Sequence, residues 1–134
     1  MADIVWKQGA ITLCFTVFLA GSALAQPGPD CTQPHTPYDK NVCSGEEAAA
    51  ADAKLNQAYG SLQSALGSAK PSAELRGAQR AWISLRDKEC AFEESLFEGG
   101  SNAPYVANTC VATYTKRRTA ELERLLKCEK NACY

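Results

Sequence analysis

Small and apolar residues recur at alternating steps of four and three along the chain, the spacing of one helix face. The first run is Ala51, Leu55, Ala58, Leu62 and Ala65. Ser44 and Glu47 precede it with the spacing of a capping box, in which each side chain accepts a backbone N–H of the first turn. Gly67 and Pro71 are typical helix-ending residues. The pattern predicts a first helix from Ser44 to just before Gly67.

Two further runs keep the same spacing. The second begins near Ser72, and its apolar positions are Leu75, Ala78, Trp82, Leu85, Phe92 and Leu96. A turn-forming stretch, residues 98–104 (EGGSNAP), separates it from a third run that ends near Asn131. The positions of the third run are Ala107, Val111, Tyr114, Arg118, Leu122 and Leu125. No stretch shows the two-residue period of a strand, so we predict an all-α, antiparallel three-helix arrangement.

The N-terminus has the pattern of a cleavable signal peptide. Residues 10–25 carry no charge and end in Ala23-Leu24-Ala25, the small-x-small pattern that signal peptidase accepts. An uncleaved anchor is the alternative, but the run is shorter than the roughly 20 residues that span a bilayer. We predict cleavage of residues 1–25, export to the periplasm or the medium, and no membrane span afterwards. Residues 26–43 then form an extended, proline-rich lead-in, and residues 44–134 form one helical domain.

Cleavage also removes Cys14 and leaves an even number of cysteines. The six are Cys31, Cys43, Cys90, Cys110, Cys128 and Cys133. In a small exported domain this favours three disulfides. A zinc site would need closely spaced Cys and His ligands, whereas His35 is the only histidine. We therefore predict no metal and no cofactor.

The helix arrangement ranks the disulfide pairings. If the second and third helices fold back about residue 100, Cys90 lies opposite Cys110. At about 1.5 Å per residue, Cys43 and Cys128 lie at opposite ends of the bundle and cannot pair. Cys31–Cys43 and Cys128–Cys133 remain, the second requiring the last helix to end between its two cysteines. A link from Cys43 to Cys90 or to Cys110 stays open, because these three lie toward one end.

Tyr59 and Trp82 are expected in the core. Folding the first two helices about residue 70 places these two rings opposite each other, and an aromatic platform for a ligand is the alternative use.

Arg86 and Asp87 point about 100° apart on a helix. We therefore do not expect Arg86 and Asp87 to pair with each other. Asn56 and Glu89 are the better partners across helices. We interpret five residues as a polar and aromatic layer that fixes helix register: Asn56, Tyr59, Trp82, Arg86 and Asp87.

The charge pattern argues against nucleic-acid binding, and the lack of a catalytic residue set argues against an enzyme. The net charge of −1 does not favour nucleic-acid binding. Residues 87–98 are acidic apart from Lys88, which indicates a solvated helix face or a surface for a basic partner. His35 stands alone in a proline-rich segment, and no Ser-His or Cys-His set accompanies it. We therefore predict that the chain is not an enzyme.

The glycine-rich turn is the candidate contact surface. Gly99 and Gly100 let backbone approach a partner, although they are equally suited to forming the turn alone. Polar side chains beside them offer hydrogen bonds, Tyr105 offers an amphipathic anchor, and the neighbouring disulfide makes the turn rigid. The candidate residues are Glu98, Gly99, Gly100, Ser101, Asn102 and Tyr105.

An ordered set of motifs gives the chain a family resemblance. Q-x-A-W-I-x-x-R-D-x-E-C at residues 79–90 is followed by G-G-S at 99–101 and by Cys110. From about Cys31 to Leu126 the chain resembles the LprI-type lysozyme inhibitor family, a group of exported bacterial helical proteins. The resemblance implies an exported protein that binds and inhibits a lysozyme or a related peptidoglycan-cleaving enzyme. An envelope structural or stress protein, or a toxin-immunity protein, with a partner other than a lysozyme is the alternative.

Overall fold

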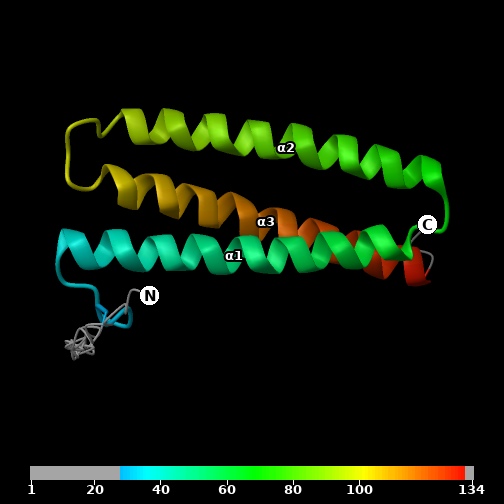
Figure 1. Cartoon of the computed structure of the whole chain (residues 1–134), viewed down its shortest axis with the longest axis horizontal. Helices are drawn as coiled ribbons and strands as arrows, with labels where there is room; N and C mark the ends of the chain where they lie inside the picture. The colour runs from blue at the N-terminus through cyan, green and yellow to red at the C-terminus, as the bar shows by residue number, and fades with distance from the viewer. Residues whose placement is uncertain (1–27, 132–134) are drawn as a thin grey trace, which may run out of the picture.

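Three long helices make up nearly all of the described chain. The computed structural model describes residues 28–131, with α1 at Pro37–Ala65, α2 at Ala69–Ser95 and α3 at Ala103–Asn131. The helices α1 and α3 run in the same direction and α2 runs in the opposite one (Figure 1). Residues 28–131 contain no strand, and this confirms the predicted all-α arrangement. The predicted signal peptide, residues 1–25, lies outside the described residues.

The first helix begins at Pro37 and not near Ser44, so the predicted start was wrong. Thr36 caps it: Thr36 Oγ1 accepts the Asp39 N–H at 3.0 Å, and the Asp39 carboxylate accepts the Thr36 N–H at 3.0 Å. Proline suits the first helical position, where no N–H is needed. Ser44 is buried inside α1, and its hydroxyl donates to the Asn41 carbonyl oxygen at 3.1 Å. A Thr-Pro-x-Asp start therefore takes precedence over the later capping box.

The third helix is the one that both others pack against. Its contacts with α1 are the most extensive and those with α2 come second, whereas α1 and α2 touch each other little. The predicted direct pairing of α1 with α2 is therefore only a minor contact. Tyr59 and Trp82 nevertheless both border the same apolar cluster, as half-buried residues that flank it.

The buried large apolar side chains are concentrated in the half of the bundle near the α1–α2 loop. The core cluster there consists of Leu55, Ala58, Leu62, Leu75 and Leu122. Leu122 of α3 is 0% exposed and lies in contact with this cluster. Burying a leucine side chain stabilises the fold by about 1.5–3 kcal/mol. The core face predicted for α1 is confirmed at Ala51, Leu55, Ala58 and Leu62.

The apolar face predicted for α2 was wrong along most of its length. Its buried residues are Leu75, Gln79 and Cys90. Leu85, Phe92 and Leu96 are instead 52%, 60% and 66% exposed. The side of α2 that meets α3 runs through Gln79 and Arg86, which a search for apolar residues passes over. The second helix thus turns an apolar stripe outward.

Two disulfides cross-link the half of the bundle that has few buried large apolar residues. Cys31–Cys43 and Cys90–Cys110 have Cα–Cα distances of 5.4 and 5.5 Å, and both predicted pairs are confirmed. The Cys90–Cys110 link closes a loop with a sequence separation of 20. A loop of that length corresponds to about 3 kcal/mol on the chain-entropy model. The predicted Cys128–Cys133 pair remains a prediction, because Cys133 lies outside the described residues.

Candidate protein-binding surface at the α2–α3 turn

Residues 96–102 form a tight turn whose two glycines are required by its geometry. Gly99 has a φ of +77°, in the left-handed region that favours glycine. The Gly100 N–H donates to the Phe97 carbonyl oxygen at 2.9 Å. A Cβ at position 100 would lie 3.0 Å from that oxygen, tighter than ordinary contacts. Both glycines are therefore explained by the turn itself, while the side chains of Glu98, Ser101 and Asn102 remain exposed.

The turn is tied to the start of α1. Asn41 Nδ2 donates to the Ser101 carbonyl oxygen at 3.0 Å. Asn108 Nδ2 of α3 lies 3.3 Å from Ser44 Oγ and 3.4 Å from the Asn41 carbonyl oxygen. These bonds use the backbone of Ser101 and leave its hydroxyl for other contacts. Sequence reasoning missed Asn41, because it took the spacing of Ser44 and Glu47 as the helix start and passed over the Thr-Pro-x-Asp signal at residues 36–39.

Exposed large apolar residues gather at this end of the bundle. Among the described residues seven such side chains are exposed, and five belong to the helix ends around the turn. These five are Tyr38, Phe92, Leu96, Phe97 and Tyr105. A monomeric protein rarely exposes grouped apolar side chains unless they meet a partner. The sequence analysis identified Tyr105 but assigned Phe92 and Leu96 to the core.

Carboxylates surround these apolar side chains. Glu89, Glu93, Glu94 and Glu98 form no ion pair within residues 28–131, although Lys88 lies among them in the sequence. Charges without an internal partner are available to an external one. The end of α2 therefore combines apolar anchors with unpaired negative charge.

Tyr105 lines two surface hollows, as does Thr109. One, of about 330 Å³, is lined by residues that include Glu93, Tyr105 and Arg117. The other, of about 600 Å³, lies between Tyr105 and the lead-in at Cys31 and Pro34. A side chain that lines two hollows is accessible from both. Tyr105 is thus well placed as an anchor for a partner protein.

Hydrogen bonds fix two carboxylates beside the lead-in. The side-chain hydroxyl of Thr32, together with its N–H, lowers the pKa of Asp30. The backbone N–H of Thr36 is the main cause of the lowered pKa of Asp39. Both groups are on the surface, and both stay negatively charged into mildly acidic solution.

A polar layer joins all three helices further along the bundle. Arg86 Nη1 of α2 lies 2.8 Å from Asp52 Oδ1 of α1 and 3.0 Å from Thr115 Oγ1 of α3. Arg86 also pairs with Asp87, with Nε and Nη2 at 3.0 and 2.9 Å from Asp87 Oδ1. The expectation that these neighbours would not pair was wrong, because a long arginine side chain reaches sideways around the helix. The expected partner Asn56 is exposed and does not bond to Arg86.

Trp82 lies close to two guanidinium groups. The Cζ atoms of Arg86 and Arg118 lie 5.3 and 6.0 Å from the centre of a Trp82 ring. Arg118 Nε donates to Gln79 Oε1 at 3.1 Å, which accounts for a buried glutamine on α2. These cation–π contacts involve Trp82 and Arg86, two of the five residues of the predicted layer. Sequence reasoning assigned no role to Asp52, Thr115 or Gln79, although Gln79 is the first residue of the motif at 79–90.

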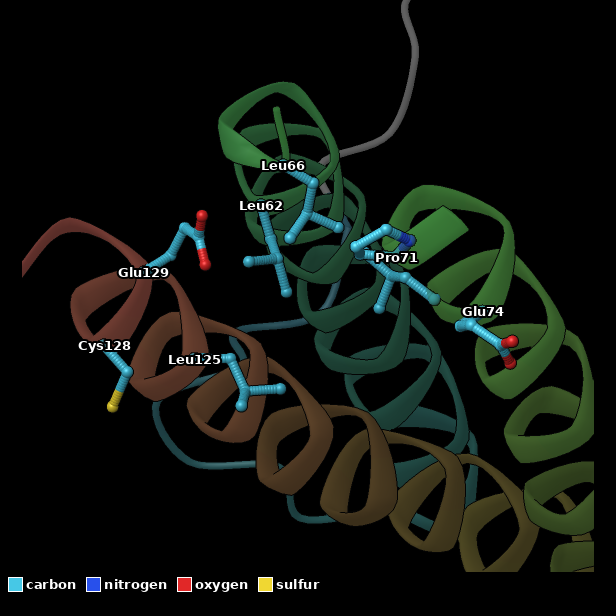
Figure 2. A pocket seen from close by; sticks show the side chains of 8 residues that line it. Leu62, Leu66, Pro71, Glu74, Leu125, Cys128 and Glu129 are labelled. Carbon is cyan, nitrogen blue, oxygen red and sulfur yellow. The ribbon is translucent and has the colours of Figure 1, made fainter. Parts of the chain in front are cut away.

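An apolar hollow of about 570 Å³ lies at the opposite end of the bundle (Figure 2). Leu62 of α1, Leu66 just after the end of α1, and Leu125 of α3 project into it, and Glu74 and Glu129 lie at its edges. It adjoins the core cluster, so we interpret it as the open end of the core.

Residues 28–131 contain no group of three or more His, Cys, Asp or Glu side chains able to hold a metal ion. No helix in this range combines the length and apolarity that crossing a membrane requires.

Comparison with known proteins relates the chain to one family. Residues 31–122 match the family described as lysozyme inhibitor LprI. An uncharacterized protein of Rhizobium meliloti (strain 1021) is 34% identical over 136 residues, covering 91% of this chain and 94% of the relative. The uncharacterized protein YecT of Escherichia coli (strain K12) is 30% identical over 116 residues, covering 71% and 72%. No solved structure gives a significant match.

Proposed function

The chain belongs to the LprI lysozyme inhibitor family, and from this we propose that it is an exported protein that binds and inhibits a lysozyme-type glycosidase. The periplasm or the medium is its proposed location, in keeping with the two disulfides. The proposed contact surface is the α2–α3 turn together with the helix ends beside it.

The observation that carries this proposal is the grouping of exposed apolar residues around a cross-linked turn. Phe92, Leu96 and Phe97 are exposed at the end of α2, and Tyr105 is exposed at the start of α3. Aromatic side chains held on rigid elements make strong anchors, because little conformational freedom is lost on binding. The disulfide Cys90–Cys110 links the last turns of α2 to the first turns of α3.

The unpaired carboxylates indicate the charge of the partner. Glu93, Glu94 and Glu98 lie among the exposed apolar residues and would attract a basic enzyme surface. Attraction of this kind mainly accelerates association and weakens as salt screens it.

A turbidity assay with the mature chain and a panel of lysozymes tests the proposal. We expect inhibition by the parent protein, and inhibition weakened at least about tenfold by Phe97→Ser or by Leu96→Ser. Leu85→Ser is the matched control, because Leu85 is exposed on the same helix but far from the turn. A parent protein that inhibits no lysozyme at any stoichiometric excess would contradict the proposed function.

A charge series separates the apolar from the electrostatic contribution. Replacing Glu93, Glu94 and Glu98 together by Gln should slow association at low salt and leave dissociation nearly unchanged. Glu123→Gln, an exposed change on α3, is the control. Equal association rates for both variants would show that these carboxylates do not face the partner.

A further inference from the structure

The shallow contact between α1 and α2 leaves a groove with an excess of positive charge. Its volume is about 320 Å³, and its charged lining residues are Asp52, Arg76, Arg80 and Arg86. Asp52 already pairs with Arg86. The lining therefore has two positive charges in excess, in a chain whose net charge is −1.

Arg76 and Arg80 have no internal partner that would explain them. Neither forms an ion pair or a side-chain hydrogen bond with any residue in the described range 28–131, and both are exposed. They are four residues apart on α2, so both guanidinium groups project from the same side of the helix. Arginine presents a planar set of N–H donors that matches a carboxylate or a phosphate. Two of them in one groove can hold a single anionic group.

The rest of the groove suits a polar ring. Leu55, Tyr59 and Ile83 supply apolar and aromatic surface, and Asn56 and Gln79 supply amides. Arg118 occupies the oxygen of the Gln79 amide, so a ligand would meet its N–H donors. Aromatic surface with nearby amides is suited to a ring that carries hydroxyl groups. A volume near the lower end of the usual range, about 300–1,000 Å³, fits a single ring and not an extended chain.

We propose that this groove binds a small sugar bearing a carboxylate or phosphate, with Arg76 and Arg80 holding the anion and Asn56 bonding to the ring. The site is separate from the α2–α3 turn and does not rest on the proposed inhibition.

Three related sugars test the site by calorimetry and by chemical-shift titration of the mature chain. N-acetylmuramic acid supplies a carboxylate, N-acetylglucosamine 6-phosphate supplies a phosphate, and N-acetylglucosamine is neutral. We expect at least one of the two anionic sugars to bind about tenfold or more tightly than the neutral sugar. Which of the two anionic sugars binds better shows whether the groove prefers a carboxylate or a phosphate. Equal affinity for all three, or no binding of any, would overturn the proposal.

Matched variants test the assigned residues. Arg76→Gln and Arg80→Gln should each weaken binding of the anionic sugar about tenfold and leave the melting temperature unchanged, because neither residue has an internal partner. Arg124→Gln, an exposed change on α3, should bind like the parent. Unchanged affinity in both groove variants would contradict the proposal.

Inorganic phosphate separates a sugar site from a simple anion site. Asn56→Ala should weaken binding of the anionic sugar and leave the weak binding of inorganic phosphate as it was. If inorganic phosphate binds as tightly as N-acetylglucosamine 6-phosphate, the groove does not recognise the ring and the proposal is wrong.

Discussion

Arg86 Nη1 of α2 lies 2.8 Å from Asp52 Oδ1 of α1, although the two helices otherwise touch little. The Arg86 side chain is 12% exposed and that of Asp52 is 45% exposed. Thr115 of α3 also contacts this pair, with its Oγ1 3.0 Å from Arg86 Nη1. A guanidinium largely withdrawn from water needs its acceptors, because an unpaired buried charge is costly.

Asp52→Asn should therefore lower the free energy of unfolding by about 1–2 kcal/mol. Asp87 still pairs with Arg86 in this variant and limits the loss. The matched control is Glu47→Gln, which breaks a cross-helix pair with Lys116 whose partners are both more than half exposed. That change should cost less than about 1 kcal/mol. Urea unfolding of the three proteins measures the difference, and equal losses in both variants would contradict the special role of the layer.

The capping box of α1 predicts a pH dependence. Its hydrogen bonds hold the pKa of Asp39 below the ordinary value of 3.8, the backbone N–H of Thr36 being the main cause. A lowered carboxylate pKa stabilises the fold above the unfolded-state value, and this contribution is lost as the pH falls through the folded-state value. Asp39→Ala should accordingly lower the melting temperature at pH 7, and the difference from the parent should shrink as the pH falls below 3.8.

Thermal unfolding between pH 2 and pH 7 measures this effect. Glu123→Ala is the control, because Glu123 forms no ion pair within the described range. A difference between Asp39→Ala and the parent that persists undiminished at pH 2 would show that the carboxylate charge is not its source.

The helix faces of α1 could be predicted from the sequence because the spacing of buried residues is a local property. Ala51, Leu55, Ala58 and Leu62 follow the predicted face. The Cys90–Cys110 pair followed equally from folding two helices about one turn. Spacing does not say which two helices meet, however. The spacing therefore did not predict that α3 would lie against both other helices.

The position of the candidate surface at the α2–α3 turn could be predicted from the sequence, but most of its exposed apolar side chains could not. The turn could be predicted because two adjacent glycines, Gly99 and Gly100, are unfavourable inside a helix and typical of a turn. The exposed stripe at Phe92 and Leu96 was assigned to the core, because an apolar face looks the same whether a helix or a partner protein covers it. Arg86 and Gln79 take the buried side of α2 because partners on α1 and α3 satisfy them, and such partners are distant in sequence.

The two turn glycines should respond differently from a helix glycine. Gly99→Ala should cost about 1–2 kcal/mol, because φ at this position is +77°. Gly100→Ala should also destabilise, because its Cβ would meet the Phe97 oxygen at 3.0 Å. In Gly77→Ala, an α2 control, the new Cβ has nothing within 4 Å. That variant should be more stable by about 0.5–1 kcal/mol. Urea unfolding distinguishes these signs, and a stabilising Gly99→Ala would rule out the turn geometry.

The Cys90–Cys110 link lies in the half of the bundle away from the buried apolar cluster, and this predicts which half opens first when the link is removed. Replacing both Cys90 and Cys110 by Ser should cost about 3 kcal/mol on the chain-entropy model. The apolar cluster around Leu122 lies in the other half and does not depend on this link. Amide hydrogen exchange should therefore accelerate most in the last turns of α2 and the first turns of α3. Replacing Cys31 and Cys43 is the matched control, because that link ties the lead-in to α1 and should accelerate exchange at the start of α1. Uniform acceleration along all three helices in the Cys90/Cys110 variant would mean that the bundle unfolds as one unit, with no independent role for its cross-linked end.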